Sequence, residues 1–145
     1  MINLRLDNNC VDDLLALTRD KYPLDRELAK QICNGSNPTS PRAQVYGCYK
    51  DGKELVAIMT ATYTLFFPHE DGTKVVQISG AYTKEEERHS GYASQLIKAI
   101  ESDAVKYYHA DYLCCDATAA ELYEKNGFIS APAGETRMWK PLRKV

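Results

Sequence analysis

Residues 75–96 read Val-Val-Gln-Ile-Ser-Gly-Ala-Tyr-Thr-Lys-Glu-Glu-Glu-Arg-His-Ser-Gly-Tyr-Ala-Ser-Gln-Leu, and the rest of the chain is organised around this stretch. Its first part is rich in β-branched residues and contains no proline, which predicts a strand. Apolar residues then recur at the spacing of one helical face, at Ala93, Leu96, Ile97, Ile100, Ala104, Tyr107 and Tyr108. The stretch is therefore predicted to be a strand and a helix joined by a polar turn that ends at Gly91.

The turn between the predicted strand and helix has a chemical use. The first amides of a helix have no acceptor within the helix, and the helix dipole adds partial positive charge there. An anion can bind these amides, Gly91 would let it approach the backbone closely, and Arg88 adds a fixed positive charge. The turn thus favours a ligand with a phosphate or pyrophosphate. A plain solvated turn is the alternative, because one glycine alone is weak evidence.

Two motifs in this part of the chain point to a known family. Residues 88–93, Arg-His-Ser-Gly-Tyr-Ala, match the Arg/Gln-x-x-Gly-x-Gly/Ala signature of the Gcn5-related N-acetyltransferase (GNAT) superfamily. Residues 119–128, Ala-Ala-Glu-Leu-Tyr-Glu-Lys-Asn-Gly-Phe, look like the second hallmark of that family, Ala-x-x-x-Tyr-x-x-x-Gly-Phe. The two motifs stand in the right order, separated by a predicted helix and short strand. The chain resembles the family over residues 43–142, and residues 1–42 fit only its general layout.

The resemblance implies a fold and a co-substrate. The fold would be a mixed α/β sheet in which antiparallel strands lead into a central βαβ unit, and the co-substrate would be acetyl-CoA. In this family the strand before the signature splays from its parallel neighbour, and the pantetheine arm pairs with exposed backbone in the resulting V. By alignment, that backbone belongs here to Ala81 and Thr83. Gly80 would either form the bulge that opens the V or simply end the strand.

The resemblance also implies where the pyrophosphate would lie. It would bind the backbone of the turn and of the first helical residues, namely Arg88, His89, Ser90, Gly91, Tyr92, Ala93 and Ser94. The hydroxyl of Ser94 could also reach a phosphate, whereas a solvent-facing His89 is the simpler interpretation of that side chain. Where the family often has proline, three residues before the arginine, this chain has Glu85 within the run Glu85–Glu87. Carboxylates here would repel a phosphate unless they point outward, so we expect them to form a solvated face.

Tyr123 is the residue that we expect to act in catalysis. When an amine attacks a thioester, the tetrahedral intermediate expels a thiolate, and a tyrosine near the sulfur can protonate it as a general acid. The matching tyrosine does so in the family; a core tyrosine packed on the sheet is the alternative. Ala119, one helical turn earlier, would face the same side. Asp116 stands where many members have asparagine, and it could bond the pantetheine or cap a helix at Ala117.

The general base that an attacking amine requires cannot be chosen from the sequence. Gln77 and Ser79 on the central strand are poor bases. The preceding turn, at residues 69–71, offers a histidine and two carboxylates, and a water relay is equally open. A backbone amide near Ala81 is the natural donor to the oxyanion of the intermediate.

Composition restricts the class of protein. The chain has 145 residues, of which 44% are hydrophobic and 26% charged, and its formal net charge is −2, which fits one ordinary domain over residues 1–145. The basic excess of a nucleic-acid-binding protein is missing, so transfer to charged tRNA is the least favoured function. No apolar run reaches the ~20 residues that span a bilayer, and the first residues do not resemble a secretory signal. We therefore expect a cytoplasmic protein without nucleic-acid or membrane partners.

The cysteines and histidines show no metal-binding pattern. The five cysteines are scattered, at Cys10, Cys33, Cys48, Cys114 and Cys115. Buried free thiols in a reducing compartment are the simplest interpretation. The three histidines lack the spacing of metal ligands, so we expect no metal site.

The remaining segments predict the order of the elements. Pro23 and Asn34-Gly35 should end two short helices near the N-terminus, and Asn126-Gly127 should cap the last helix. The predicted elements are, in order, a strand at 2–6, two short helices, strands at 44–49 and 54–67 joined by a turn at 51–52, the central strand and helix, a short strand at 112–115, a helix at 117–126, and strands at 128–130 and 136–142. The strand at 112–115 should lie parallel to the one before Arg88.

Two functions follow from the resemblance. The first is an N-acetyltransferase that moves an acetyl group from acetyl-CoA to a primary amine by direct attack in a ternary complex. A small cationic amine and a peptide amine both fit as the acceptor. The second is a catalytically weak acyl-CoA sensor or interaction module of the same fold. Homodimers are common in the family, so a homodimer is a further expectation, although the sequence identifies no interface.

Overall fold

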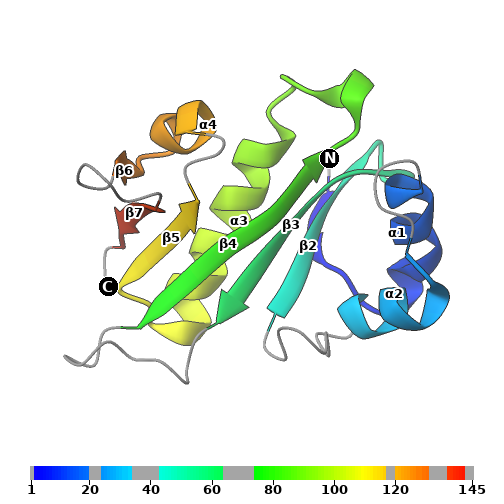
Figure 1. The fold of residues 1–145 in the computed structure, drawn as a ribbon, viewed down its shortest axis with the longest axis horizontal. Coiled ribbons are helices and arrows are strands. Elements are labelled where there is room, and N and C mark those ends of the chain that lie inside the picture. The colour runs from blue at the N-terminus through cyan, green and yellow to red at the C-terminus, as the bar shows by residue number, and fades with distance from the viewer. Residues whose placement is uncertain are drawn as a thin grey trace.

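A computed structural model gives the fold, and it describes residues 2–19, 24–33, 43–63, 74–116, 120–130 and 137–142 (Figure 1). The elements are, in chain order, β1 (Ile2–Arg5), the 3₁₀ turn η1 (Asn8–Cys10), α1 (Val11–Thr18), α2 (Arg26–Cys33), β2 (Ala43–Lys50), β3 (Glu54–Tyr63), β4 (Val75–Thr83), the 3₁₀ turn η2 (Glu85–Glu87), α3 (Tyr92–Tyr108), β5 (Tyr112–Asp116), α4 (Ala120–Lys125), β6 (Ile129–Ser130) and β7 (Arg137–Pro141). This order confirms the predicted one. Pro23 and Asn34-Gly35, which were expected to end the first two helices, lie outside the described residues.

Within the described residues the strands form one seven-stranded sheet in the order β1-β2-β3-β4-β5-β7-β6. Among these strands only β4 and β5 are parallel neighbours, and the other pairs are antiparallel. A parallel pair needs a crossover connection, which α3 supplies. The predicted mixed α/β sheet with a central βαβ unit is confirmed.

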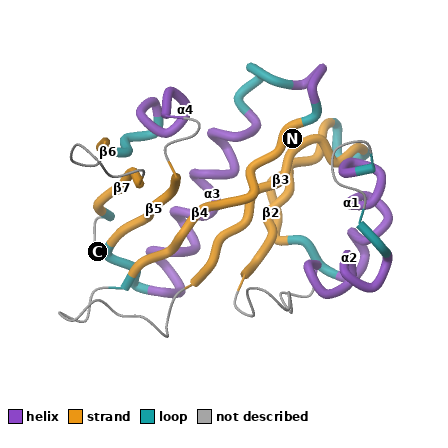
Figure 2. Tube along the Cα trace, in the orientation of Figure 1, coloured by secondary structure: helices purple, strands orange, loops and turns teal. Residues whose placement is uncertain are grey.

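The helices cover the two faces of the sheet and enclose two hydrophobic clusters. The first cluster packs α3 and α4 on one face and includes Met59, Ile78 and Leu96. The second packs α1 and α2 on the opposite face and includes Leu14 and Ile58. Figure 2 shows α1 and α2 grouped beside β2, with α3 crossing the sheet near its middle. Burial of these apolar side chains is the main favourable contribution to folding.

The end of α4 has the geometry that the sequence predicts. Gly127 has a φ of +89°, which glycine adopts without steric cost. Its amide donates to the carbonyl of Glu124 (3.1 Å), and the amide of Phe128 donates to the carbonyl of Tyr123 (3.0 Å). This pair of bonds is the Schellman motif, which satisfies the last carbonyls of a helix.

All five cysteines are buried with free thiols, as predicted. Across the described parts of the chain, none of the helices combines the length and apolarity that crossing a membrane requires.

Candidate active site

The parallel strands β4 and β5 are paired over only part of their length. Their ladder runs from Val75 opposite Tyr112 to Ile78 opposite Cys115 and stops there, whereas β4 continues beside β3 as far as Thr83. Figure 1 shows the two strands starting side by side and ending apart. The splay implied by the family resemblance is therefore present.

A β-bulge stands where β4 leaves its parallel neighbour. Ser79 lies opposite Thr60, but the next paired residue of β4 is Tyr82, opposite Ile58. Gly80 and Ala81 therefore face a single residue of β3, which is the definition of a bulge. Gly80 has a φ of +60°, so glycine supplies the left-handed conformation that this bulge uses. Of the two roles proposed for Gly80, the bulge is confirmed.

A cleft of about 630 Å³ opens over the splayed strands. Its walls are the end of β4, the turn into α3, the first turn of α3, and α4. Eight of the predicted cofactor-binding residues line it: Ala81, Thr83, Arg88, His89, Gly91, Tyr92, Ala93 and Ser94. The described lining does not include Ser90, which is exposed on the same turn, or Asp116, which is exposed at the end of β5. Ala119 and the proposed cap at Ala117 lie outside the described residues.

The turn into α3 presents backbone amides to this cleft. Gly91 is the N-cap residue, with a φ of +86°, and it has no side chain to cap the helix. The amide of Gln95 donates to the carbonyl of Gly91 (3.1 Å), so the amides of residues 92–94 lie ahead of the helical ladder. A Cβ atom built on Gly91 would meet nothing within 4 Å. The first amides of α3 are thus approachable by an anion.

Arg88 is held against the end of β4. Its Nε donates to the carbonyl of Thr83 (3.2 Å), and the side chain is exposed. His89, the next residue, is also exposed and has a φ of +66°. The bond from Arg88 fixes the turn relative to β4 and keeps a permanent positive charge at the cleft.

The acidic run before Arg88 departs in part from expectation. Glu85 and Glu86 are exposed, as predicted, but Glu87 lines the cleft and its side chain is only 14% exposed. The expectation that all three carboxylates form a solvated face is therefore wrong for Glu87. Lys50, at the end of β2, compensates the negative charge of Glu87, because its Nζ lies 2.7 Å from Oε1 of Glu87. Their hydrogen bond raises the pKa of Lys50.

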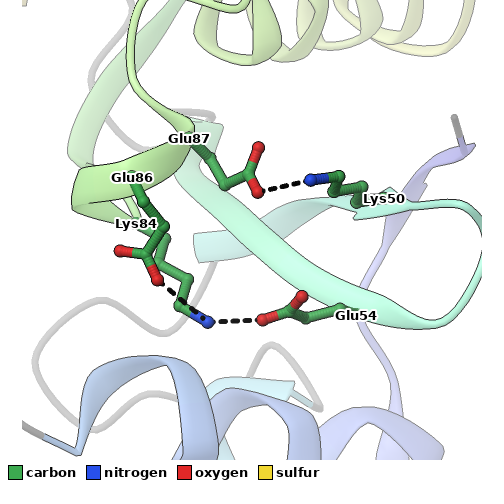
Figure 3. Close-up of polar contacts among 5 residues, drawn as sticks. All are labelled: Lys50, Glu54, Lys84, Glu86 and Glu87. Carbon is green, nitrogen blue, oxygen red and sulfur yellow. Dashed lines mark hydrogen bonds and ion pairs between the residues drawn. The ribbon is translucent and has the colours of Figure 1, made fainter.

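A second lysine neutralises the outer carboxylates of the same region. Lys84 forms ion pairs with Glu54 and with Glu86, the latter at 3.4 Å. Figure 3 shows Lys50 pointing toward Glu87, and Lys84, which directly precedes η2, with its ammonium group between Glu54 and Glu86. Two of the three carboxylates of η2, those of Glu86 and Glu87, are thus paired within the protein, which reduces the repulsion that an approaching phosphate would meet.

Tyr123 lies on α4, with its side chain in the core beside the cleft. The residue is 4% exposed, and its ring packs edge-on against Phe128 with 5.2 Å between centroids. Its neighbours Glu121, Leu122 and Lys125 line the cleft, whereas Tyr123 is not among the described lining residues. Burial raises the pKa of Tyr123 to about 12, and the nearby Cys115 and Asp116 add to this rise. Its hydroxyl therefore keeps its proton at neutral pH.

A hydrogen bond joins the two helices that flank the cleft. Nδ2 of Asn126 donates to Oγ of Ser94 (3.1 Å) and to the carbonyl of Leu122 (2.9 Å). From the sequence, Asn126 is predicted only as a helix cap, and Ser94 as a side chain that could reach a phosphate. The Ser94 hydroxyl can still donate its own hydrogen, because it accepts from Asn126.

The remaining predicted groups are placed as follows. Ser79 is exposed on β4, opposite Thr60. The candidate bases at residues 69–71 lie outside the described residues. Within the described part of the chain, no three His, Cys, Asp or Glu side chains gather in a way that could hold a metal ion.

A family model covers the part of the chain that forms the cleft. The sequence model of an acetyltransferase (GNAT) domain matches residues 41–130, which include the cleft. No curated protein sequence matches the chain significantly.

Solved structures share the fold at low sequence identity. A ribosomal-protein-alanine N-acetyltransferase from Brucella melitensis is 17% identical with a TM-score of 0.70, covering 98% of this chain and 100% of its own. Arabidopsis thaliana NAA60 in complex with acetyl-CoA is 17% identical with a TM-score of 0.68, and the match covers 97% of this chain and 99% of the NAA60 chain. A variant of the spermidine N-acetyltransferase SpeG from Vibrio cholerae is 12% identical with a TM-score of 0.70, and the match covers 97% of this chain and 95% of the SpeG chain.

Proposed function

Because the chain belongs to the GNAT acetyltransferase family, we propose that it transfers an acetyl group from acetyl-CoA to a primary amine by direct attack of the amine in a ternary complex. One observation carries this proposal. The splayed end of β4 and the approachable amides of α3 line the same cleft. A ligand with a pyrophosphate at one end and an amide-bearing arm at the other matches that pair of features.

Within this cleft the residues of the chain have separate roles. Acetyl-CoA supplies the activated acetyl thioester. The amides of Gly91 to Ser94, with the charge of Arg88, hold the pyrophosphate, and the backbone of Ala81 and Thr83 pairs with the arm. An amide of the bulge, near Ala81, would then stabilise the oxyanion that forms when the amine attacks the thioester.

Tyr123 would act as the general acid. A phenol that keeps its proton at neutral pH is a donor throughout the working range, and the thiolate that leaves the intermediate needs a proton. The hydrogen bond from the amide of Phe128 to the carbonyl of Tyr123 fixes the position of Tyr123 at the end of α4, and the contact between the two rings adds to this.

A second function, binding without efficient turnover, is favoured by one observation. Tyr123 is 4% exposed and stands behind the residues that line the cleft, so its hydroxyl would need access to the thiolate. A panel of primary amines separates the two functions. Turnover that Tyr123→Phe abolishes while acetyl-CoA binding persists supports the enzyme; binding with no turnover on any amine supports a sensor.

The first experiment is a calorimetric titration of the protein with acetyl-CoA and, separately, with CoA. Arg88→Glu should weaken binding of both ligands, because it replaces an attractive charge beside the phosphates with a repulsive one. Lys106→Glu makes the same charge change near the other end of α3 and should leave the affinity unchanged. Failure of the folded wild-type protein to bind either ligand would overturn the proposal.

A further inference from the structure

A second pocket, of about 280 Å³, adjoins the cleft through the β4 bulge. Gly80 lines this pocket and Ala81 lines the cleft, so the two residues of the bulge face different cavities. Ile58 of β3 lines both. A reacting group held at the bulge is therefore next to the mouth of each cavity.

The walls of the second pocket are mostly apolar, and they come from the helices α1 and α2 on one side and from the sheet on the other. Helices α1 and α2 contribute Leu14 and Ile32, strand β2 contributes Val45, and Leu24 precedes α2. Its described lining contains no charged side chain. This sets it apart from the cleft, whose lining includes Glu87, Arg88, Glu121 and Lys125.

The polar side chains in the described lining of the pocket are those of two threonines. Thr18 is buried, and its Oγ1 donates to the carbonyl of Leu14 (2.9 Å), so its hydrogen is used within α1. Thr60, on β3, is half-buried beside the bulge. A Cβ atom on Gly80 would lie 3.2 Å from Oγ1 of Thr60, which shows how closely the bulge and this side chain approach.

We propose that this pocket holds an uncharged, apolar group of the acceptor amine, and that it excludes acceptors that carry a second charge at that position. The inference rests on the proposed function. A charge moved into apolar surroundings without a partner loses its hydration, which is costly. The volume lies just below the ~300–1,000 Å³ of typical ligand pockets, so it suits one side group rather than a whole ligand.

Two arms of one assay test this proposal on the wild-type protein, with acetyl-CoA as the donor. The first compares pentylamine with 1,5-diaminopentane, which differ by one terminal ammonium group. We expect kcat/KM for pentylamine to be at least about tenfold higher. Across propylamine, butylamine and pentylamine, kcat/KM should rise about threefold to fourfold per methylene. The second arm compares the peptides Leu-Gly-Gly and Asp-Gly-Gly, and it tests the same selectivity for apolar over charged groups when the acceptor is a peptide α-amine.

A matched pair of variants tests the location of the selectivity. Ile32 is half-buried and lines the pocket from α2, so Ile32→Glu would bring a carboxylate to it. This variant should raise kcat/KM for 1,5-diaminopentane relative to pentylamine, whereas Ile32→Gln, of similar size without the charge, should not. Calorimetric titration with acetyl-CoA shows that each variant is folded.

The outcomes separate this inference from the proposed function. If the wild-type protein acetylates 1,5-diaminopentane as well as or better than pentylamine, and Asp-Gly-Gly as well as Leu-Gly-Gly, the apolar selectivity is overturned while the transferase stands. If the protein binds acetyl-CoA but acetylates none of these amines, the transferase proposal fails and the assignment of the pocket fails with it.

Discussion

The ring of Tyr123 packs edge-on against the ring of Phe128, and the amide of Phe128 donates a 3.0 Å hydrogen bond to the carbonyl of Tyr123. The two residues are thus joined both by the backbone hydrogen bond that caps α4 and by the contact between their rings. Gly127 between them makes it possible, because its left-handed backbone turns the chain back toward α4. The spacing Tyr-x-x-x-Gly-Phe therefore has a physical reason: it fixes the tyrosine at the last turn of the helix.

Gly127→Ala should destabilise the protein by about 1–2 kcal/mol, the cost of a left-handed backbone for a residue with a Cβ atom. The new Cβ would also lie 3.3 Å from Cε of Lys140, which must move. Urea unfolding measures the change. Gly52→Ala is the matched control, since Gly52 also has a positive φ (+71°) but stands in the exposed turn between β2 and β3. Both variants should lose stability, and only Gly127→Ala should also lower kcat; equal effects on kcat would contradict the positioning role.

Tyr123→Phe should lower kcat by about 10²–10⁴-fold if the hydroxyl is the general acid. The affinity for acetyl-CoA should stay within about twofold, because the ring and its contact with Phe128 are retained. Tyr107→Phe, which removes a hydroxyl from an exposed residue of α3, should change neither quantity. Steady-state kinetics and calorimetry on the three proteins decide the matter, and a Tyr123→Phe variant with full turnover would eliminate Tyr123 as the acid.

The pH dependence of the reaction should not report Tyr123 below about pH 10. The pKa of Tyr123 is raised to about 12, so the hydroxyl is protonated, and able to donate, at every lower pH. A rise in kcat/KM between pH 6 and 9 would then come from deprotonation of the amine or its base. For the wild-type protein, every amine of a homologous series should show this rise in kcat/KM. The pH at which the rise occurs should shift with the pKa of the amine. A profile that falls between pH 7 and 9 for every amine would contradict the raised pKa.

Lys50→Ala should weaken acetyl-CoA binding by about threefold to tenfold, because it leaves the charge of Glu87 uncompensated in the cleft. The double variant Lys50→Ala/Glu87→Gln should recover most of the lost affinity. Lys84→Ala removes an equal charge from the outer side of the same turn and should change the affinity by less than about twofold. The effect of Lys50→Ala should also shrink at high salt. Equal losses for the two lysine variants would mean that Glu87 does not face the ligand.

Gly80→Ala should cost more free energy in the reaction, calculated from the loss in kcat/KM, than it costs in the free energy of unfolding. The positive φ disfavours a side chain, and the new Cβ would crowd Thr60 between the cleft and the second pocket. We expect a loss of about 1–2 kcal/mol in the free energy of unfolding and a larger loss in kcat/KM, because the bulge sets where the acyl group and amine meet. Urea unfolding and kinetics on the same preparation compare the two losses. A loss in kcat/KM no larger than the loss of stability would remove the bulge from the reaction.

The sequence predicted those parts of the site that depend on local pattern. The bulge at Gly80, the turn at Gly91 and the cap at Gly127 all depend on short stretches in which glycine restricts the backbone, whereas the parallel pair followed from the strand–helix–strand order. Such patterns are written within a few residues, so one sequence is enough to find them.

The sequence missed what depends on distant residues meeting. Lys50 and Glu87 are 37 positions apart, and their contact depends on where the end of β2 lies relative to η2. Asn126 and Ser94, 32 positions apart, meet only because α4 packs beside α3. The second pocket draws its walls from α1, α2 and three strands. A glutamate run signals a solvated surface, and only tertiary structure reveals that one member, Glu87, is half-buried and paired with a lysine.

The short ladder between β4 and β5 leaves an opening in the sheet that the proposed ligand would bridge. Four pairs of residues, from Val75 with Tyr112 to Ile78 with Cys115, join the two strands before they separate. An arm bonded to the backbone of residues 81–83 would extend the hydrogen-bonded pattern across the opening, as a short segment of strand would. Ligand binding should then slow amide hydrogen exchange in the last residues of β4, and it should make the two halves of the sheet unfold as one cooperative unit.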